Sequence, residues 1–323
     1  MSTFWYAVLG LLFMAYFALG GLDQGVALLL PLHKGDPARR AALNAVGPRF
    51  LGNEVWIVGA VGVLIAAFPR LEGELFGAAY PVIIVVVLGL AALNAGVQLR
   101  GRGTSTGGFD ALITAGALAL AVGWGLLLGV VTHGVPMTAD GHVHGFAPLA
   151  SPAVWLTALV NVVLVVANGA AYLAWRTADP RMRRVLSQAG PAGAALVLVA
   201  AAVWYTQKPP GVSNPLLATG LVVATAAALV ATRFTSGGRA FTATLVACAL
   251  PVITVALARY PGVLASTMDP GATVTVDSAA AGGDTLRLLA IGAAPLLPVL
   301  VAVQVSCWWL FRRRESQPTP LYW

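Results

Sequence analysis

An aspartate stands inside an apolar run that is long enough to cross a lipid bilayer. Asp23 follows Gly20 and Gly21 in the run 4–30, and a spanning helix needs about 20 apolar residues. A carboxyl group in that setting costs about 2.5–3.5 kcal/mol or more, so such residues usually serve ion or proton movement. Asp23 lies roughly 10 Å from the end of the run, at 1.5 Å per residue. The position predicts a functional acid within the membrane.

A second acid opens the next apolar run. Glu54 falls in the first turn of the run 52–68, directly after Asn53. Because consecutive spans are antiparallel, Glu54 and Asp23 are expected at a similar depth. Our hypothesis is that Asp23, Asn53 and Glu54 face each other or a shared water-filled pocket and help conduct protons.

Two other interpretations of these acids stay open. Asp23 could hydrogen-bond unwound backbone beside its glycines, while Glu54 gains from the positive N-terminus of its helix. Alternatively, Asp23 could be the coupling-ion ligand of a secondary transporter or channel, at a helix interrupted by glycine. The two halves of the chain hold no clear pair of matching interrupted runs, which argues against the transporter.

The chain offers few ligands for a redox metal. Haem iron needs His, Met or Cys ligands within the apolar region, and the candidates are His33, His133, His142, His144, Met14, Cys248 and Cys307. The histidines lie in loops or at the end of a run, and no two candidates have ligand spacing. We therefore expect no bound haem, no metal and no catalytic residue. A surface metal at Asp140, His142 and His144 is the weaker alternative to a solvated loop.

The elements that position these residues are membrane spans. The composition is 59% hydrophobic and 10% charged, whereas soluble domains carry about 25% charged residues. The chain is thus expected to be one all-α, polytopic membrane domain over 1–323. Its apolar runs predict nine transmembrane helices, at 4–30, 52–68, 75–98, 111–133, 152–175, 190–206, 215–232, 241–258 and 288–311.

The basic residues fix the direction of these spans. When the loops are numbered alternately, all but four of the 19 lysines and arginines fall on one face; the exceptions are Arg70, Lys208, Arg259 and Arg287. Positive residues stay on the cytoplasmic side, which places the N-terminus outside and the C-terminus in the cytoplasm. The net charge of +7 is therefore explained by topology, and no nucleic-acid partner is expected.

Three stretches of the chain resemble subunit II of the cytochrome bd quinol oxidases. The first is Gly-Leu-Asp-Gln-Gly at 21–25, followed by Leu-His-Lys-Gly-Asp-Pro-Ala-Arg-Arg at 32–40. The second is Pro-Arg-Phe-Leu-Gly-Asn-Glu-Val-Trp at 48–56, close to the family's Pro-His-Trp-Asp-Gly-Asn-Gln-Val-Trp. The third lies at 260–286 and leads into the last span and a basic tail. The middle of the chain matches mainly in its pattern of spans.

The resemblance implies a fold of two four-helix bundles plus one peripheral helix. It also implies a heterodimer with a larger subunit I, which holds haem b and haem d, oxidises quinol and reduces oxygen in the respiratory chain of a bacterial plasma membrane. The second subunit would be haem-free. In the family it is associated with a quinone (menaquinone or ubiquinone), with a lateral oxygen route at a tryptophan that Trp56 matches, and with a proton route that includes the acid matched by Asp23. Membrane lipid and small accessory subunits are further expected partners.

One departure from the family pattern concerns the second stretch. Leu51 stands where the family has aspartate, and Glu54 stands where it often has glutamine. The two positions are three residues apart and lie on neighbouring faces of one helix. Either Glu54 replaces the lost carboxylate, or this subunit has given up the proton route to subunit I.

Overall fold

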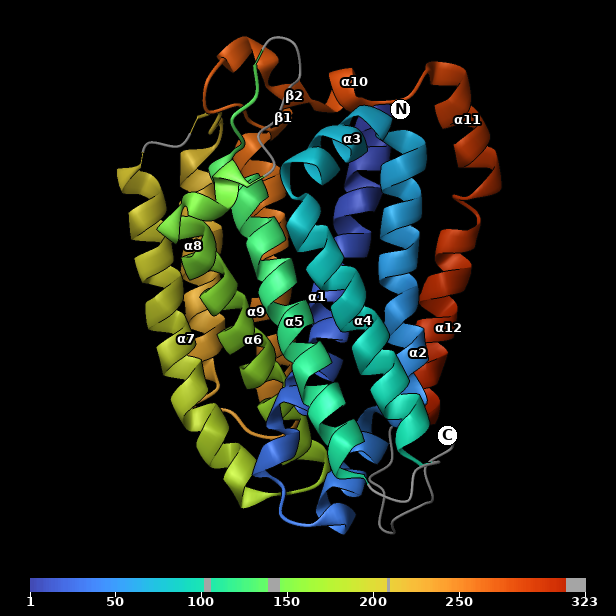
Figure 1. The fold of residues 1–323 in the computed structure, drawn as a ribbon, viewed down its shortest axis with the longest axis vertical. Helices are drawn as coiled ribbons and strands as arrows, with labels where there is room; N and C mark the ends of the chain where they lie inside the picture. The colour runs from blue at the N-terminus through green and yellow to red at the C-terminus, as the bar shows by residue number, and fades with distance from the viewer. Residues whose placement is uncertain (102–105, 139–145, 208–209, 312–323) are drawn as a thin grey trace.

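The computed structural model describes residues 1–101, 106–138, 146–207 and 210–311, and it shows a bundle of long helices (Figure 1). Eight helical segments of the described chain are long and apolar enough to cross a membrane, and one shorter apolar helix accompanies them. They are α1 (Ser2–Leu29), α2 (Asp36–Ala67), α4 (Tyr80–Arg100), α5 (Gly107–His133), α6 (Pro152–Arg176), α7 (Pro180–Thr206), α8 (Pro215–Ala231, the shorter one), α9 (Gly238–Arg259) and the last segment, α11 (Gly283–Gly292) with α12 (Leu296–Leu310).

The second span differs from its prediction. It was expected over 52–68, but α2 begins at Asp36. Gly35 precedes the helix, a proline stands in its first turn, and Asp36 lies at the positive helix end, three features that favour a helix start. The charged segment that looked like a loop is therefore helical. Glu54 lies in the middle of α2, so the interpretation that a helix N-terminus stabilises it is wrong.

Two other spans also have different boundaries. Residues 69–78 form a separate short helix, α3 (Pro69–Ala78), and the third span begins at Tyr80 rather than at 75. The last span, expected as one helix over 288–311, is divided between α11 and α12. Pro295 stands between them and cannot continue the backbone hydrogen bonds of a helix.

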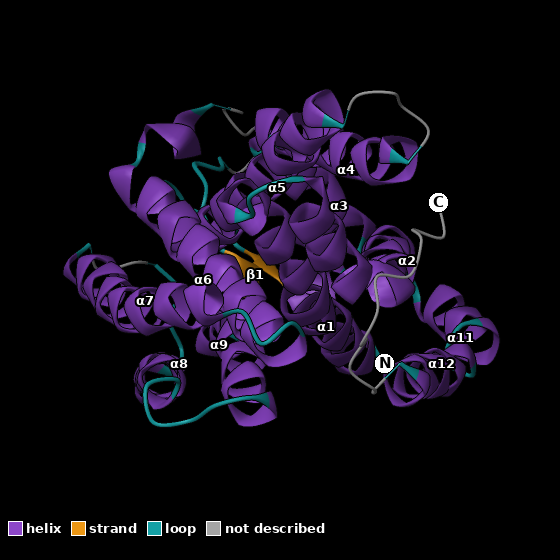
Figure 2. Ribbon diagram, turned by 90° about the horizontal axis from the view of Figure 1, so that it is seen from below, coloured by secondary structure: helices purple, strands orange, loops and turns teal. Residues whose placement is uncertain are grey.

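Helix α1 runs through the middle of the molecule (Figure 2) and contacts α2, α5, α6 and α9. The helices α1, α2, α4 and α5 form one four-helix group, and α6 to α9 form the second. The segment α11–α12 lies at the edge, beside α2 (Figure 1). This is the arrangement of two bundles and a peripheral helix that the family resemblance implies.

Glycines allow the two groups to approach closely. At Gly25 of α1, an added Cβ would lie 1.9 Å from the carbonyl oxygen of Val165, and at Gly169 of α6 it would lie 2.3 Å from the Gly25 carbonyl carbon. Only glycine fits at this crossing. Helix α1 continues without interruption through Gly20, Gly21 and Gly25, so the idea of unwound backbone next to Asp23 is wrong. These glycines serve packing.

The two ends of the bundle differ in character. At the end where the N-terminus lies, the strands β1 (Gly262–Leu264) and β2 (Val274–Thr275) pair antiparallel and the short helix α10 (Val276–Ala279) follows; we call this the hairpin end. The opposite end, where α1, α4 and α6 terminate, carries Arg39, Arg40, Arg100 and Arg176; we call it the basic end. The connections also contain the short 3-10 helices η1 (Leu30–Leu32), η2 (Ala147–Ala150) and η3 (Pro270–Ala272).

Candidate functional site: buried polar groups within the spans

Asp23 belongs to a chain of polar side chains that links three helices. Asn53 Nδ2 of α2 donates to Asp23 Oδ2 of α1 at 3.0 Å, and the side-chain amide of Gln304 of α12 lies 2.9 Å from Asn53 Oδ1. All three residues are buried, with Asp23 4% exposed and Asn53 0%. The sequence analysis named Asp23 and Asn53 but missed Gln304, because 250 residues separate it from them. The structure brings all three together.

Asp23 keeps one carboxylate oxygen free for another partner. Asp23 Oδ1 is buried and has no hydrogen-bond partner among the described residues. The carboxylate borders a small cavity of about 10 Å³, with Gly47 and Phe50 of α2 and Leu93 of α4 in its wall. That volume is close to the minimum that holds one water molecule. The site is therefore an acid at the edge of a space of water size.

Glu54 has a partner of its own. Asn94 Nδ2 of α4 donates to Glu54 Oε1 at 2.5 Å, and Asn94 also donates to the Leu90 carbonyl. Glu54 is half-buried, whereas Leu51 one turn earlier is 55% exposed. Asp23 and Glu54 thus do not share a hydrogen bond. They are connected through consecutive residues of α2, since Asn53 binds Asp23 and Glu54 binds Asn94.

Trp56 points into the protein rather than outward. It is 6% exposed, and its Nε1 has no partner within the described part of the chain. Asn53 and Trp56 are three residues apart on α2, and both side chains are buried. The exposed face of this helix is instead apolar, with Leu51, Val55 and Val58.

An arginine counted as a loop charge is buried beside this polar chain. Arg49 is 1% exposed; its Nη1 donates to the Tyr172 hydroxyl at 2.6 Å and its Nη2 to the Phe311 carbonyl at 2.5 Å. Its guanidinium lies 4.4 Å from the ring centroid of Trp308. Arg176 Nη2 also donates to the Phe311 carbonyl, at 3.1 Å. Two cations therefore hold the C-terminal end of α12, where helix dipoles favour positive charge.

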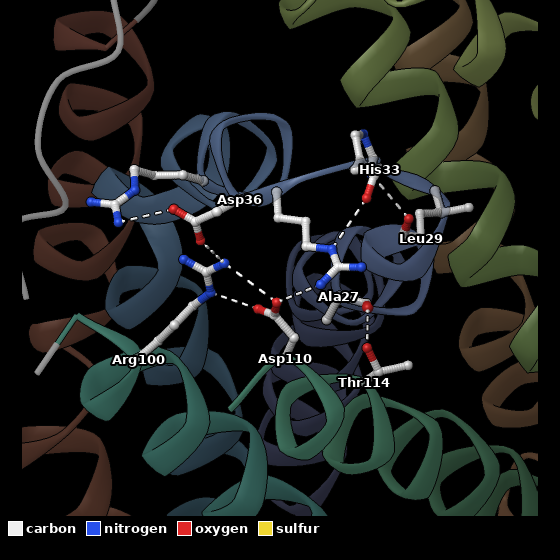
Figure 3. Close-up of polar contacts among 9 residues, drawn as sticks. Ala27, Leu29, His33, Asp36, Arg100, Asp110 and Thr114 are labelled. Atoms are coloured by element: carbon white, nitrogen blue, oxygen red, sulfur yellow. Dashed lines mark hydrogen bonds and ion pairs between the residues drawn. The ribbon is translucent and has the colours of Figure 1, made fainter. Parts of the chain in front are cut away.

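A second polar cluster joins the three helices α2, α4 and α5 at the basic end (Figure 3). Arg100, with 0% of its side chain exposed, pairs with Asp110 at 2.6 Å and with Asp36 at 2.7 Å. Arg39 pairs with the other oxygen of Asp110 at 2.9 Å, and Arg40 with Asp36 at 3.2 Å. We call these five residues the end cluster. Sequence reasoning used its arginines only as topology signals, because a bare charge count gives no sign of their partners.

The ligand types considered for metals are not assembled. Within the described ranges, no group of three His, Cys, Asp or Glu residues could hold a metal ion. His133 contacts Gln207 and His33 lies 3.9 Å from Asp179. The loop with Asp140, His142 and His144 falls outside the described residues, so the surface-metal alternative stays untested.

The sequence is similar to known second subunits of bd oxidases. The family model of cytochrome bd terminal oxidase subunit II matches residues 1–311. The cytochrome bd ubiquinol oxidase subunit 2 of Bacillus subtilis is 26% identical, and the alignment covers 99% of this chain and 98% of the relative. The cytochrome bd-I ubiquinol oxidase subunit 2 of Escherichia coli K12 is also 26% identical, with 94% and 92% covered.

The fold is similar to that of a solved oxidase. A chain in the structure of bd oxidase from Geobacillus thermodenitrificans superimposes with a TM-score of 0.74, over 97% of this chain and 99% of the other, at 19% sequence identity. At that identity the likeness concerns the fold.

Proposed function

Because this chain belongs to the cytochrome bd terminal oxidase subunit II family, we propose that it is the haem-free subunit of a quinol:oxygen oxidoreductase. In this role it packs against a haem-bearing subunit I and contributes to oxygen and proton access. The family assignment supersedes the transporter interpretation of Asp23. Three features of the structure support the docking on subunit I and the roles in oxygen and proton access. They are the positions of the two acids, the positions of their hydrogen-bond partners, and the exposed apolar face.

Subunit I would dock on the face formed by α2, α4 and α12. On α2, Leu51, Val55 and Val58 are exposed at helical spacing, with exposures of 55%, 45% and 70%. Glu54 lies within this stripe and is only half-buried. A carboxyl group that faces lipid costs free energy, whereas a protein partner can cover it and form a hydrogen bond with it. The single observation that carries the proposal is this acid in an apolar, uncovered stripe.

The weak packing of α12 supports the same face. Gln304 is its one buried side chain, and Leu296, Val299 and Val303 are each more than half exposed. A helix that buries so little of itself in its own subunit is expected to lie against another one, since helices in membranes associate by close packing and polar contacts.

A bulky substitution tests this docking face. Val58→Trp is expected to abolish co-purification of the haem-bearing subunit, because a large side chain cannot enter a packed interface without strain. Val199→Trp on α7 is the matched control, since Val199 is 51% exposed on the other group of helices. Equal haem absorption per copy of this chain in both variants would contradict the proposed face.

For protons, we place the route at the basic end, through Asp23 and Asn53 with Glu54 as a neighbouring carrier. Asp23 has a free oxygen next to a space of water size, and Asn94 orients Glu54. Asparagine offers both a donor and an acceptor and so can hold a carboxyl group or water in place. This assignment requires the basic end to be cytoplasmic, which the positive-inside rule supports.

For oxygen and quinone, the chain offers two apolar places. Trp56 is buried on α2 behind the docking stripe, and we assign it to the oxygen route; Trp56→Phe should then raise the KM for oxygen without loss of haem. An open-sided cavity of about 100 Å³ near the hairpin end, bordered by Thr132, His133, Trp204 and Arg259, is our candidate contact site for the edge of the quinone ring, since it is too small to enclose the whole ring. Filling it with Val197→Trp should remove quinone from the purified complex; unchanged quinone content would refute the assignment.

A further inference from the structure

A large groove opens between α9 and α12 at the basic end. Its lining excludes Leu51, Val55 and Val58 of the docking stripe but includes Gln304, which also contacts Asn53. Its volume is about 1160 Å³, which exceeds the usual 300–1,000 Å³ of small-molecule pockets. Leu19 of α1 lies in its wall, and the α8–α9 connection borders it as well. The groove is thus wide enough for a long, flexible ligand.

The wall of the groove is a row of aromatic rings. Trp175 stacks on Phe241 with ring centroids 5.7 Å apart, and Phe241 stacks on Trp308 at 5.7 Å. The row connects α6, α9 and α12. Further from the basic end the lining becomes aliphatic, with Leu245 and Val305. A ligand that fits this surface has an apolar part that runs along the rings toward the middle of the membrane.

The charges around the groove are positive. Arg239 is the charged residue among the described lining residues, which include no carboxylate. Two further cations lie behind the rings, because the Arg49 guanidinium is 4.4 Å from the Trp308 ring centroid and the Arg176 guanidinium 5.8 Å from that of Trp175. The N-terminus of α9, which has no acidic residue in its first turn, adds to this field. An anionic head group is the complement of such a site.

We propose that this groove binds one anionic phospholipid, with its phosphate near Arg239 and an acyl chain along Phe241 and Trp308. Basic pockets between membrane helices at the cytoplasmic surface bind anionic lipid head groups through the same electrostatic attraction between arginine or lysine and phosphate. A quinone can accept a hydrogen bond from Arg239 through its carbonyl oxygens, but it has no negative charge to complement the three cations. Free phosphate would leave the aromatic row uncovered. The lipid would join α9 to α12, the helix with the least packing in its own subunit.

Native mass spectrometry of the intact complex tests the proposal. The complex is equilibrated in phosphatidylcholine nanodiscs that contain a fixed share of phosphatidylglycerol, and the lipids retained after release are counted. We expect one retained phosphatidylglycerol, and in Arg239→Gln an occupancy about fivefold lower, the effect of one basic contact to an anionic lipid. Arg233→Gln is the matched control, since Arg233 is exposed in the α8–α9 connection, six residues before Arg239, but does not line the groove.

A steric pair of variants tests the apolar part of the site. Leu245→Trp narrows the aliphatic part of the groove and should release the lipid, whereas Val246→Trp, at an exposed neighbouring position, should retain it. The haem spectrum of each preparation verifies that the complex is assembled. Retention of phosphatidylcholine and phosphatidylglycerol in equal numbers would overturn the proposal, as would equal lipid content in Arg239→Gln and Arg233→Gln. Either result would leave the oxidase role untouched.

Discussion

The end cluster and the two acids within the spans, Asp23 and Glu54, which we call the mid-span acids, are both polar assemblies with buried members. They differ in how their charges are compensated. In the end cluster every carboxylate faces at least one arginine, and Arg100 alone contacts both Asp36 and Asp110. In the spans, Asp23 and Glu54 are held by the neutral amides of Asn53 and Asn94. Paired charges resist a change of protonation because a buried partner would lose its counter-ion. Amide partners permit a carboxyl group to gain or lose a proton, so we assign stability to the first assembly and proton exchange to the second.

The largest effect is expected in the end cluster. Arg100→Met leaves Asp110 and Asp36 without their buried partner, and breaking a buried ion pair in this way costs about 3–5 kcal/mol. The amount of assembled complex and its midpoint of thermal inactivation should both fall sharply. Arg40→Met is the matched control, since Arg40 also binds Asp36 but has 38% of its side chain exposed; exposed pairs contribute about 0–1 kcal/mol. An equal decrease of the thermal midpoint in the two variants would contradict the claim that the buried Arg100 stabilises the end cluster more than the exposed Arg40.

The next largest effect concerns turnover rather than assembly. Asp23→Asn keeps the shape and the hydrogen bond to Asn53 but cannot carry a proton, so proton uptake by the assembled complex should fall at least about tenfold. Asp110→Asn is the comparison. It should reduce the yield of complex while the turnover per haem stays normal. Proton uptake in reconstituted vesicles, normalised to haem, measures both.

Leu51, which stands where the family has aspartate, allows a second test of the mid-span acids. Glu54→Gln should slow proton uptake several-fold, less than Asp23→Asn, because Glu54 is half-buried and has access to neighbouring groups. Adding Leu51→Asp to Glu54→Gln restores a carboxyl group one turn away on α2 and should recover part of the rate. If this double variant is no faster than Glu54→Gln, subunit I supplies the route alone.

A stability effect smaller than that of Arg100→Met is expected at Arg49, which lies along α2 between residues of the two assemblies. Arg49→Lys keeps the charge but cannot reach the Tyr172 hydroxyl and the Phe311 carbonyl together, since lysine lacks the planar fork of arginine. The loss of one charged hydrogen bond is worth about 1.5–3 kcal/mol at most. The thermal midpoint should decrease by less than in Arg100→Met, with unchanged turnover. A turnover defect at full haem content would instead place Arg49 in the proton route.

Much of the fold was accessible from the sequence because the membrane imposes simple rules. Apolar length indicated the nine spans, and the asymmetry of the arginines indicated their alternation. The boundaries at Asp36 and Pro295 were missed, since hydropathy does not report where a helix continues outside the apolar region or is interrupted within it. Charge counting was misleading for Arg49 and Arg100, which are buried although they stand in basic segments.

The candidate site could be predicted only in part. Asp23 could be identified because a carboxyl group within an apolar run costs free energy and is usually functional. Asn53 and Glu54 were identified from their position in the stretch 48–56. Gln304 and Asn94 are amides on distant helices, and their role depends on helix packing that no spacing in the sequence reveals. The glycines beside Asp23 suggested an interrupted helix, but the contact between Gly25 and Gly169 explains them by packing.

Redox-induced infrared difference spectroscopy of the intact complex is the most direct measurement of whether the mid-span acids exchange protons while the end cluster does not. We expect a carboxylic C=O signal that disappears in Asp23→Asn, weakens in Glu54→Gln and persists in Asp110→Asn. A signal that survives both mid-span substitutions, or that vanishes in Asp110→Asn, would contradict this account.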